Sequence, residues 1–426
     1  MADWSADYRL LERGRIDMER LFGTIRRGVL GQLGPASGPA VVALDDTLIH
    51  KSGRKVHGAA WRRDPLGPKF QTSLAWGQRF LQFSMMLPET GEPACRARAI
   101  PIRFDHCPTL KKLKPTASPE AKAAWKAQAA KTRLPAVAVQ SLGRLRRQMD
   151  QDGQAGRRLI VSGDGGYTNK TVLAGLPERA TFVGRLRKDA KLCAVPDPIE
   201  PGTRGRRRQY GATLRTPEQT RQDQARPWRP VTAWAAGKLH AFDVKVVGPV
   251  RWRAGGPRDL QLMIVRPLAY RLHAGASLLY REAAYLICTD PNMDAQQMLQ
   301  AYLWRWEIEV NHREEKTLLG VGQPQARVEQ AAALAPAFQV AAYAGLLLAM
   351  HAAYGQAGLS PLPQPKWQRP DPAGRLSTAK AIGILRAEAW GAGIRHFSGF
   401  APGIPLRPEP HENDSSFAQA LCLASP

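Results

Sequence analysis

Three acidic positions stand out because of the residues around them. Asp45 and Asp46 close a short apolar run, Val41–Leu44, and Asp164 follows a second apolar run within a glycine-rich segment. Glu309 lies in a predicted helix that is rich in tryptophan and arginine. Taken singly, an aspartate after a strand is also typical of a turn, and a glutamate among cations is typical of a surface ion pair. Together they place carboxylates next to segments that are predicted to be buried.

The position of Glu309 on its helix sets it apart from the neighbouring glutamates. At about 100° per residue, Tyr302, Arg305, Glu309 and Lys316 fall on one stripe about 60° wide. The other glutamates of this segment fall outside the stripe. One acid is therefore flanked on a single helix face by a tyrosine and two cations.

Carboxylates of this kind predict a site for hard divalent cations, which prefer oxygen ligands. Two such ions can activate one oxygen and stabilise another in the displacement of a phosphodiester. Zinc is not expected, because the five cysteines are at least 12 residues apart and form no CxxC pair. We expect these cysteines to be reduced, buried thiols.

The charge of the chain predicts a polyanionic partner. Lys and Arg number 61 against 36 Asp and Glu, which gives a net charge of +25. Basic residues cluster at 111–114, 143–148 and 204–210, and tryptophans are interleaved with arginines, a combination that suits DNA. The alternatives are an arginine-rich composition without function and an anionic membrane surface.

No membrane span is expected. The longest uninterrupted apolar stretch, Val340–Met350, has 11 residues, whereas a span needs about 20. The first residues lack the basic and then apolar pattern of a signal peptide. We therefore expect a cytoplasmic protein with a buried helix at this stretch.

The elements that must position the acids alternate between strands and helices. A strand precedes each aspartate motif, and a helix capped by Thr168 and then a strand follow Asp164, which predicts an α/β core. Further predicted strands are 71–76 and 80–87, separated by a turn at 76–79. The predicted helices are 6–33, 119–132, 136–149, 295–319 (capped by Asp294), 327–353 and 377–391. Residues 190–282 are dense in Pro, Gly and Arg with short β-like runs, which indicates a β-rich insertion.

The chain resembles a known family in several of these motifs. The spacing Tyr302-x2-Arg305-x3-Glu309-x6-Lys316 matches the Y-R-E-K signature of bacterial insertion-sequence transposases of the DDE superfamily. LDDT at 44–47 and SGDGGYTNK at 162–170 resemble the first and second acidic motifs of that family. VGRLRKDAKL resembles its arginine-rich strand and 377–391 its C-terminal helix, so the resemblance covers about residues 38–395.

The resemblance implies an RNase H-like catalytic core, a mixed sheet flanked by helices. It implies that Asp46, Asp164 and Glu309 form the catalytic, metal-binding triad, which would hold two Mg²⁺ ions, with Mn²⁺ able to substitute. Asp46 is favoured over Asp45 because the catalytic aspartate of the family directly precedes a threonine.

The resemblance and the basic clusters also indicate residues that contact DNA. In relatives a tryptophan of the insertion holds a flipped base; the candidates here are Trp228, Trp234 and Trp252, for each of which core packing is the alternative. The expected DNA contacts are Tyr302, Arg305, Arg313, Lys316, Arg185, Arg187, Lys188, Arg206, Arg207, Arg208 and Trp252.

The expected organisation places the core on both sides of the insertion. The expected parts are a helical N-terminal segment that could contact DNA (1–37), the core (38–189 and 284–355), the insertion (190–283), a proline-rich linker with a C-terminal helix (356–400) and a tail (401–426). The expected activity is metal-dependent cleavage at terminal inverted repeats and strand transfer into target DNA by a homodimer. The alternatives are a catalytically silent or domesticated DNA-binding relative, an RNase H-like nuclease without strand transfer, and a basic scaffold that is not an enzyme.

Overall fold

The computed structural model describes residues 6–35, 38–64, 67–68, 70–110, 112–198, 207–271, 275–354 and 376–386. The chain divides into two compact units, residues 1–344 and 345–426. The first unit holds every candidate carboxylate and all the strands found among the described residues. In the second, residues 378–386 are helical, as predicted for the described part of the C-terminal helix.

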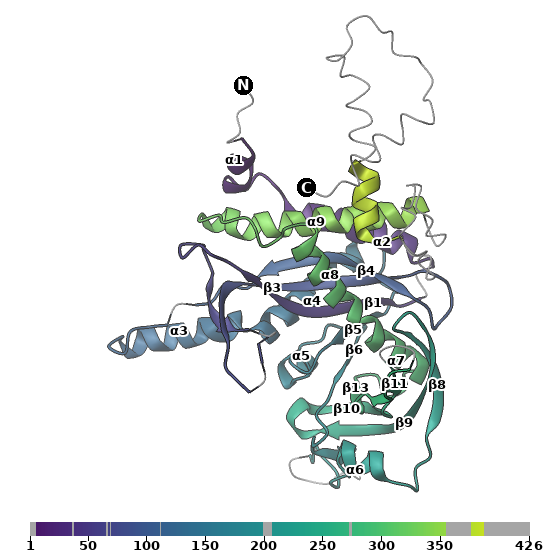
Figure 1. The fold of residues 1–426 in the computed structure, drawn as a ribbon. Coiled ribbons are helices and arrows are strands. Elements are labelled where there is room, and N and C mark those ends of the chain that lie inside the picture. Colours follow the sequence, from purple (N-terminus) through teal and green to yellow (C-terminus); the bar gives the residue numbers. More distant parts are fainter. Residues whose placement is uncertain are drawn as a thin grey trace, which may run out of the picture. The chain divides into compact units, whose positions relative to one another are not determined.

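A large mixed sheet forms the centre of the first unit (Figure 1). Its strand order is β2-β3-β1-β5-β6-β13-β10-β9-β7, with β4 paired to β3 and β8 paired to β9. β1 runs antiparallel to β3 and parallel to β5, and β6 is parallel to β5. This mixed sheet flanked by helices is consistent with the predicted RNase H-like core. The core strands are β1 (Ala40–His50), β2 (Ala60–Arg63), β3 (Leu74–Pro88), β4 (Ala97–His106), β5 (Leu159–Gly163), β6 (Ala180–Arg185) and β13 (Ala284–Cys288).

The first strand is longer than predicted. β1 continues past the two aspartates to His50, because residues 45–50 pair with β3 without a break in register. Asp45 and Asp46 therefore lie inside a strand and not at its end. Their side chains alternate between the two faces of the sheet, since successive residues of a strand point to opposite sides.

The predicted turn at 76–79 is wrong, and β3 runs through it as one strand. Gly77 pairs with His50, and a Cβ atom on Gly77 would lie 2.4 Å from the carbonyl oxygen of Ile49. The glycine therefore permits a close approach of two strands, which a sequence pattern does not separate from a turn.

The helices of the N-terminal half differ from prediction in two places. The helix predicted at 6–33 is two helices, interrupted where Gly14 adopts a φ of 60°, and Asp17 accepts a hydrogen bond from the Arg20 amide and caps the second helix. The short helix after Asp164 is capped by Asn169 and not by Thr168. These helices are α1 (Ala6–Glu12), α2 (Met18–Gln32), α3 (Pro119–Thr132), α4 (Leu134–Gln151) and α5 (Lys170–Ala174).

The segment 190–283 is rich in strands, and most of them extend the central sheet. β13 pairs with β10, β10 with β9, and β9 with both β7 and β8. A separate ribbon joins β11 to β12. The elements of this segment are β7 (Leu192–Ala194), α6 (Pro217–Gln222), β8 (Arg229–Ala235), β9 (Lys238–Trp252), β10 (Gly256–Val265), β11 (Ala269–Tyr270) and β12 (Leu279–Tyr280).

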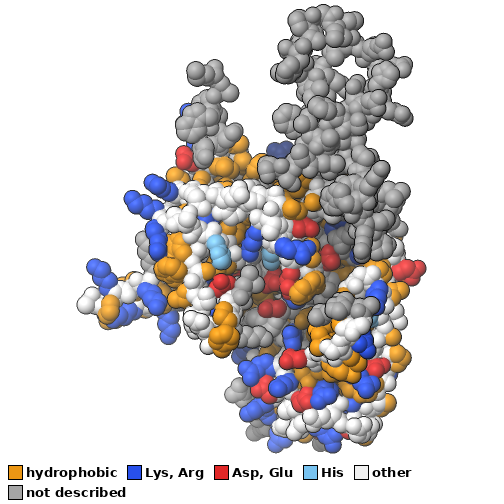
Figure 2. All heavy atoms as spheres, viewed as in Figure 1, with side chains coloured by type: hydrophobic (Ala, Val, Ile, Leu, Met, Phe, Trp, Pro, Cys, Tyr) orange, Lys and Arg blue, Asp and Glu red, His pale blue; other side chains and the backbone are white. Residues whose placement is uncertain are grey.

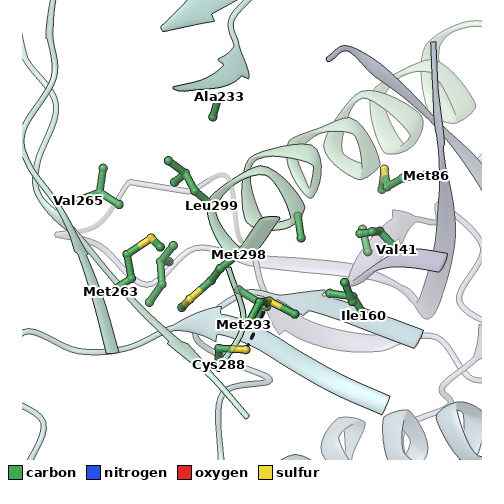
Figure 3. Close-up of a cluster of buried hydrophobic side chains, with 14 of the residues drawn as sticks. Val41, Met86, Ile160, Ala233, Met263, Val265, Cys288, Met293, Met298 and Leu299 are labelled. Carbon is green, nitrogen blue, oxygen red and sulfur yellow. Dashed lines mark hydrogen bonds between the residues drawn. The ribbon is translucent and has the colours of Figure 1, made fainter. Parts of the chain in front are cut away.

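The helix predicted at 295–319 is divided at Arg305 into α7 (Ala295–Trp304) and α8 (Trp306–Thr317). Asp294 caps α7 as predicted, accepting a hydrogen bond from the Gln297 amide. Met298 and Leu299 of α7 and Ile308 of α8 are buried in one hydrophobic cluster with strand residues such as Val41. In Figure 3, Leu299 lies on the side of Val265, and Met298 lies between Met263 and Met293. This packing fixes α7 and α8 on the face of β1 that carries Val41, Ala43 and Asp45.

The apolar helix α9 (Glu329–Tyr354) contains Pro336, as predicted. It is the one helix among the described residues that is long and apolar enough to cross a membrane by length and composition, and half of its most apolar window is buried within the protein. Tyr343 donates a hydrogen bond to Glu314 and accepts one from Asn311, so α9 is joined to α8. The four described cysteines, Cys95, Cys107, Cys193 and Cys288, are free and buried.

Candidate active site

The candidate site begins where two parallel strands bring aspartates to the same level. Leu44 of β1 pairs with Gly163, the last residue of β5, and the next residues are Asp45 on β1 and Asp164 directly after β5. In a parallel ladder, paired residues point to the same face of the sheet. The register therefore places Asp45, and not Asp46, at the level of Asp164 on the face covered by α8.

Asp45 is surrounded by charged groups on that face. Its side chain is only 19% exposed, and its Oδ2 lies 3.4 Å from Nη1 of Arg305. Burial raises the pKa of Asp45 to about 6, against the opposing charges of His312 and Arg305, and the nearby charges of Asp164 and Asp46 add to the rise. The raised pKa of Asp45 therefore reflects its removal from water more than the charges around it.

The side chain of Asp46 has different neighbours from that of Asp45. The hydroxyl of Tyr167 donates a hydrogen bond of 2.8 Å to its Oδ1, and Nε of Arg79 lies 3.2 Å from its Oδ2. Tyr167 is itself buried, and burial together with the charge of Asp46 raises its pKa. Both carboxylate oxygens of Asp46 therefore already have partners, from β3 and from the turn after β5.

Asp164 is held by the turn that follows β5. Its Oδ1 accepts hydrogen bonds from the amides of Gly166 and Tyr167, at 2.8 and 3.3 Å. The Thr168 hydroxyl donates to the carbonyl oxygen of Asp164. Among the described residues, these hydrogen bonds to the carboxylate engage Oδ1 and not Oδ2.

Glu309 reaches the site through Arg305. Nη2 of Arg305 lies 2.9 Å from Oε1 of Glu309, while Nη1 of the same guanidinium faces Asp45. The guanidinium also lies 5.8 Å from the ring centre of Tyr302. Tyr302, Arg305 and Glu309 thus share one face, as the sequence predicted, and the cation bridges two acids from different elements. Figure 2 shows acidic side chains near the middle of the view, with basic and histidine side chains beside them.

Two buried side chains beside Asp45 escaped the sequence analysis. Gln82 pairs with Asp45 across β1 and β3 and is fully buried, and His312 lies one turn beyond Glu309 on α8. Within the described part of the chain, neither Gln82 Oε1 nor His312 Nε2 has a hydrogen-bond partner. The signal for His312 was its spacing of three residues from Glu309; Gln82 had none, because its place depends on strand register.

The oxygen atoms at this site are of the type that divalent cations prefer. They are the carboxylate oxygens of the acids and the amide oxygen of Gln82, which has no hydrogen-bond partner among the described residues. In the arrangement described, however, no three His, Cys, Asp or Glu side chains lie close enough together to hold a metal ion, counting only the residues that the structure describes. The Arg305 guanidinium stands between Asp45 and Glu309, where a metal cation would have to share the same oxygens.

The other predicted DNA contacts lie on several surfaces. Arg185, Lys188, Arg207, Arg208, Arg313 and Lys316 are exposed. Arg187 is exposed but is paired with Asp189 at 2.9 Å, and Arg206 lies outside the described residues.

The tryptophans proposed to hold a flipped base are all partly buried. The ring of Trp228 is flanked by Lys245 at 4.5 Å and Arg266 at 5.8 Å. Trp252 packs against Gly255, where a Cβ atom would lie 2.3 Å from its ring. Among the described tryptophans, the exposed ones are Trp61 and Trp306, on β2 and α8.

A comparison with known families identifies a family for this chain. The family described as DDE superfamily endonuclease matches residues 5–256, which is more than half of the 426 residues. The matched range contains Asp45, Asp46 and Asp164 and ends before Glu309. A search of curated proteins gave no match.

Proposed function

The chain belongs to the DDE superfamily of endonucleases, and from this premise we propose that it is a DNA transposase of a bacterial insertion sequence. The observation that supports this most strongly is the meeting of three acids from distant segments. Asp45 lies on β1 and Asp164 directly follows the parallel strand β5 at the same level, and Glu309 is joined to Asp45 by Arg305. The proposed activity is cleavage of DNA at the transposon ends, followed by joining of the freed ends to target DNA.

We assign the first acid of the triad to Asp45 instead of Asp46, which the sequence favoured. Asp45 shares its face with α8, and Asp46 is already paired with Tyr167 and Arg79. The assignment makes Asp46 a positioning residue, which holds Tyr167 and so supports the turn that carries Asp164.

Asp45, Asp164 and Glu309 would hold two Mg²⁺ ions, with Mn²⁺ able to substitute. Bound there, the ions would activate the attacking oxygen and stabilise the leaving one. Arg305 has a double role in this proposal, since it neutralises Asp45 and Glu309 in the free protein and is free to bind a phosphate once they hold metal. Tyr302 and Lys316, on the same stripe, would bind phosphates next to the cleaved bond.

The proposed partners are the terminal inverted repeats and target DNA. Two ends must be held together for joining, which favours a homodimer in the synaptic complex. The proposed location is the cytoplasm, with the protein on the nucleoid when it is bound to DNA.

A plasmid excision assay with the flanking ends of the element tests the proposal. Wild type should excise, and Asp164→Asn should not, while DNA binding stays intact. Cleaved but never joined products would support a nuclease without strand transfer. DNA binding without metal-dependent cleavage of labelled ends would support a catalytically silent relative.

A further inference from the structure

An exposed aromatic cluster lies on the ribbon formed by β2 and the start of β3. Trp61 pairs with Trp76 across the two strands, and their rings meet edge to face with centroids 5.7 Å apart. The guanidinium of Arg54 lies over both rings, at 5.1 and 5.5 Å. We call Arg54, Trp61 and Trp76 the aromatic platform.

Within the aromatic platform, Trp76 is fixed by hydrogen bonds, and Trp61 is exposed to solvent. The indole of Trp76 donates a hydrogen bond to the Gly53 carbonyl oxygen, and the Lys51 amide donates to the Trp76 carbonyl oxygen. Lys51 in turn donates to the carbonyl oxygens of Gly322 and Pro324. Trp61, by contrast, is 53% exposed. Trp61 contacts Trp76 and Arg54 while half of its surface stays in water. Such exposure of a large ring is unusual for core packing and typical of a binding surface.

The surroundings of the platform are basic. Arg54, Lys55 and Arg63 are exposed, and Arg62 is directed inward by its hydrogen bonds to the Cys107 carbonyl oxygen and the Thr109 hydroxyl. The same ribbon also exposes Phe70, at 92%. Stacking rings among cations suit an unpaired nucleic-acid strand, in which the bases are free to stack and the phosphates need neutralisation.

The platform lies on the face of the sheet that carries the candidate site. Trp76, Gln78 and Gln82 are an even number of residues apart on β3, so their side chains point to the same face of the sheet. Gln82 pairs with Asp45 on that face. Six residues of strand separate Trp76 from Gln82, which corresponds to about 20 Å at about 3.3 Å per residue. Gln78 and Gln82 are fully buried, and Gln78 donates a hydrogen bond to the Ala332 carbonyl oxygen of α9, so this face of β3 is covered between the platform and the candidate site.

We propose that the aromatic platform binds unpaired DNA by stacking a base on Trp61, with Arg54 holding the ring and neutralising the adjacent phosphate. The proposal rests on the proposed function for the identity of the partner. It differs from the tryptophans expected in the insertion, because Trp228, Trp234 and Trp252 are partly buried and Trp61 lies on the core sheet.

Binding in EDTA tests the platform separately from cleavage. Fluorescence anisotropy would compare full-length wild type, Trp61→Ala, Trp61→Phe and Arg54→Gln on a labelled oligothymidylate of about 15 nucleotides and on a duplex of the same length. Tyr280→Ala is the matched control, because Tyr280 is an exposed aromatic residue (66%) on β12, away from the platform.

Trp61→Ala should weaken single-strand binding by about tenfold, which corresponds to about 1.4 kcal/mol, and should affect the duplex less. Trp61→Phe should largely restore binding, Arg54→Gln should give a smaller loss, and Tyr280→Ala should stay within about twofold of wild type. Quenching of a 2-aminopurine base in the oligonucleotide should disappear in Trp61→Ala.

Several results would overturn the platform. The proposal fails if wild type does not bind the single strand, or if Trp61→Ala binds it as tightly as wild type. It also fails if Trp61→Ala loses as much affinity for the duplex as for the single strand, or if Trp61→Phe binds the single strand no better than Trp61→Ala. Because Trp61 is half exposed, Trp61→Ala should fold, and circular dichroism checks this; Arg54→Gln tests the platform without altering either ring. Platform binding without excision would count against the transposase and not against the platform.

Discussion

Asp45 and Asp46 differ in what surrounds them, although they are adjacent in the chain. Burial raises the pKa of Asp45 to about 6, although the charges of His312 and Arg305 oppose the rise. Asp46 receives a hydroxyl and a guanidinium that satisfy both its oxygens. Asp45 also has partners, since its Oδ1 accepts a hydrogen bond from the Asp46 amide and its Oδ2 lies 3.4 Å from Arg305. What separates the two aspartates is that Asp45 lies on the face of the sheet covered by α8.

The two aspartates can be separated by a pair of substitutions. We expect Asp45→Asn to lower metal-dependent cleavage by more than about 100-fold, since even groups that only orient metal ligands cost about 10- to 100-fold. Asp46→Asn should lose only about 10- to 100-fold, through its effect on Tyr167. Initial cleavage rates on labelled end DNA measure both, and anisotropy confirms DNA binding. A larger loss in Asp46→Asn than in Asp45→Asn would return the triad to Asp46.

At the scale of elements, the site depends on strands that approach each other closely and on helices tied to them. Gly77 allows β3 to lie against Ile49 of β1, which keeps Gln82 in register with Asp45. On the same sheet, Glu19 of α2 is linked to Arg103 of β4 and to Arg144 of α4, at 2.8 and 2.9 Å. Each contact joins elements that are distant in sequence.

Gly77→Ala should destabilise the protein. The new Cβ atom would lie 2.4 Å from a backbone oxygen that cannot rotate away, and overpacking of this kind costs about 1–3 kcal/mol. Gly91→Ala is the matched control, because a Cβ there meets nothing within 4 Å. Urea denaturation should show a lower midpoint for Gly77→Ala only; equal midpoints for both variants would contradict the close approach of β1 and β3.

Glu19 should make stability depend on pH in the acid range. Partial burial opposes ionisation, but hydrogen bonds and charge from Arg103 hold the pKa of Glu19 at about 2, below its usual 4.5. A lowered carboxyl pKa stabilises the folded state above pH 4.5, and this contribution is lost as the pH falls from 4.5 toward 2. Because Glu19 is half exposed, we expect the contribution to be only about 1 kcal/mol at neutral pH.

Urea titrations of wild type and Glu19→Gln at a series of pH values measure this contribution. The two proteins should differ at neutral pH and converge below pH 4.5. A constant difference across the whole range would mean that Glu19 acts by packing and not by charge.

At the scale of the whole molecule, the chain carries a net charge of +25, and its central sheet is lengthened by β13, β10, β9 and β7. Exposed cations occur on the core strand β6, on the helix α8 and beside β7, at positions such as Arg185, Lys316 and Arg207. Binding to a polyanion through many such contacts releases counterions and is therefore strongly weakened by salt.

Lys316→Ala should reduce the slope of log affinity against log salt by about one unit, because one phosphate contact is lost. Arg187→Ala should change the slope less, since Asp189 already pairs with that guanidinium. Anisotropy titrations on duplex DNA over a range of salt concentrations measure both slopes. An unchanged slope in Lys316→Ala would remove this residue from the DNA-binding surface.

The sequence by itself determined the α/β class, most helices, and the shared face of Tyr302, Arg305 and Glu309, because apolar periodicity and helical spacing are local properties. It also singled out Asp164 and the basic character of the chain. It placed the strand before Asp45 and Asp46 correctly but ended it too early, because polar residues can continue a strand when a neighbouring strand pairs with them.

Only the tertiary structure decided which aspartate faces α8. That choice follows from the register of β1 against β5, a one-residue difference that turns a side chain to the other face. Strand pairing also places Gln82 opposite Asp45. It gives Gly77 a role in close packing instead of a turn. Trp61 pairs with Trp76 and stays exposed to solvent. In each case the deciding partner is a neighbouring strand, and local sequence does not specify which residue of that strand it meets.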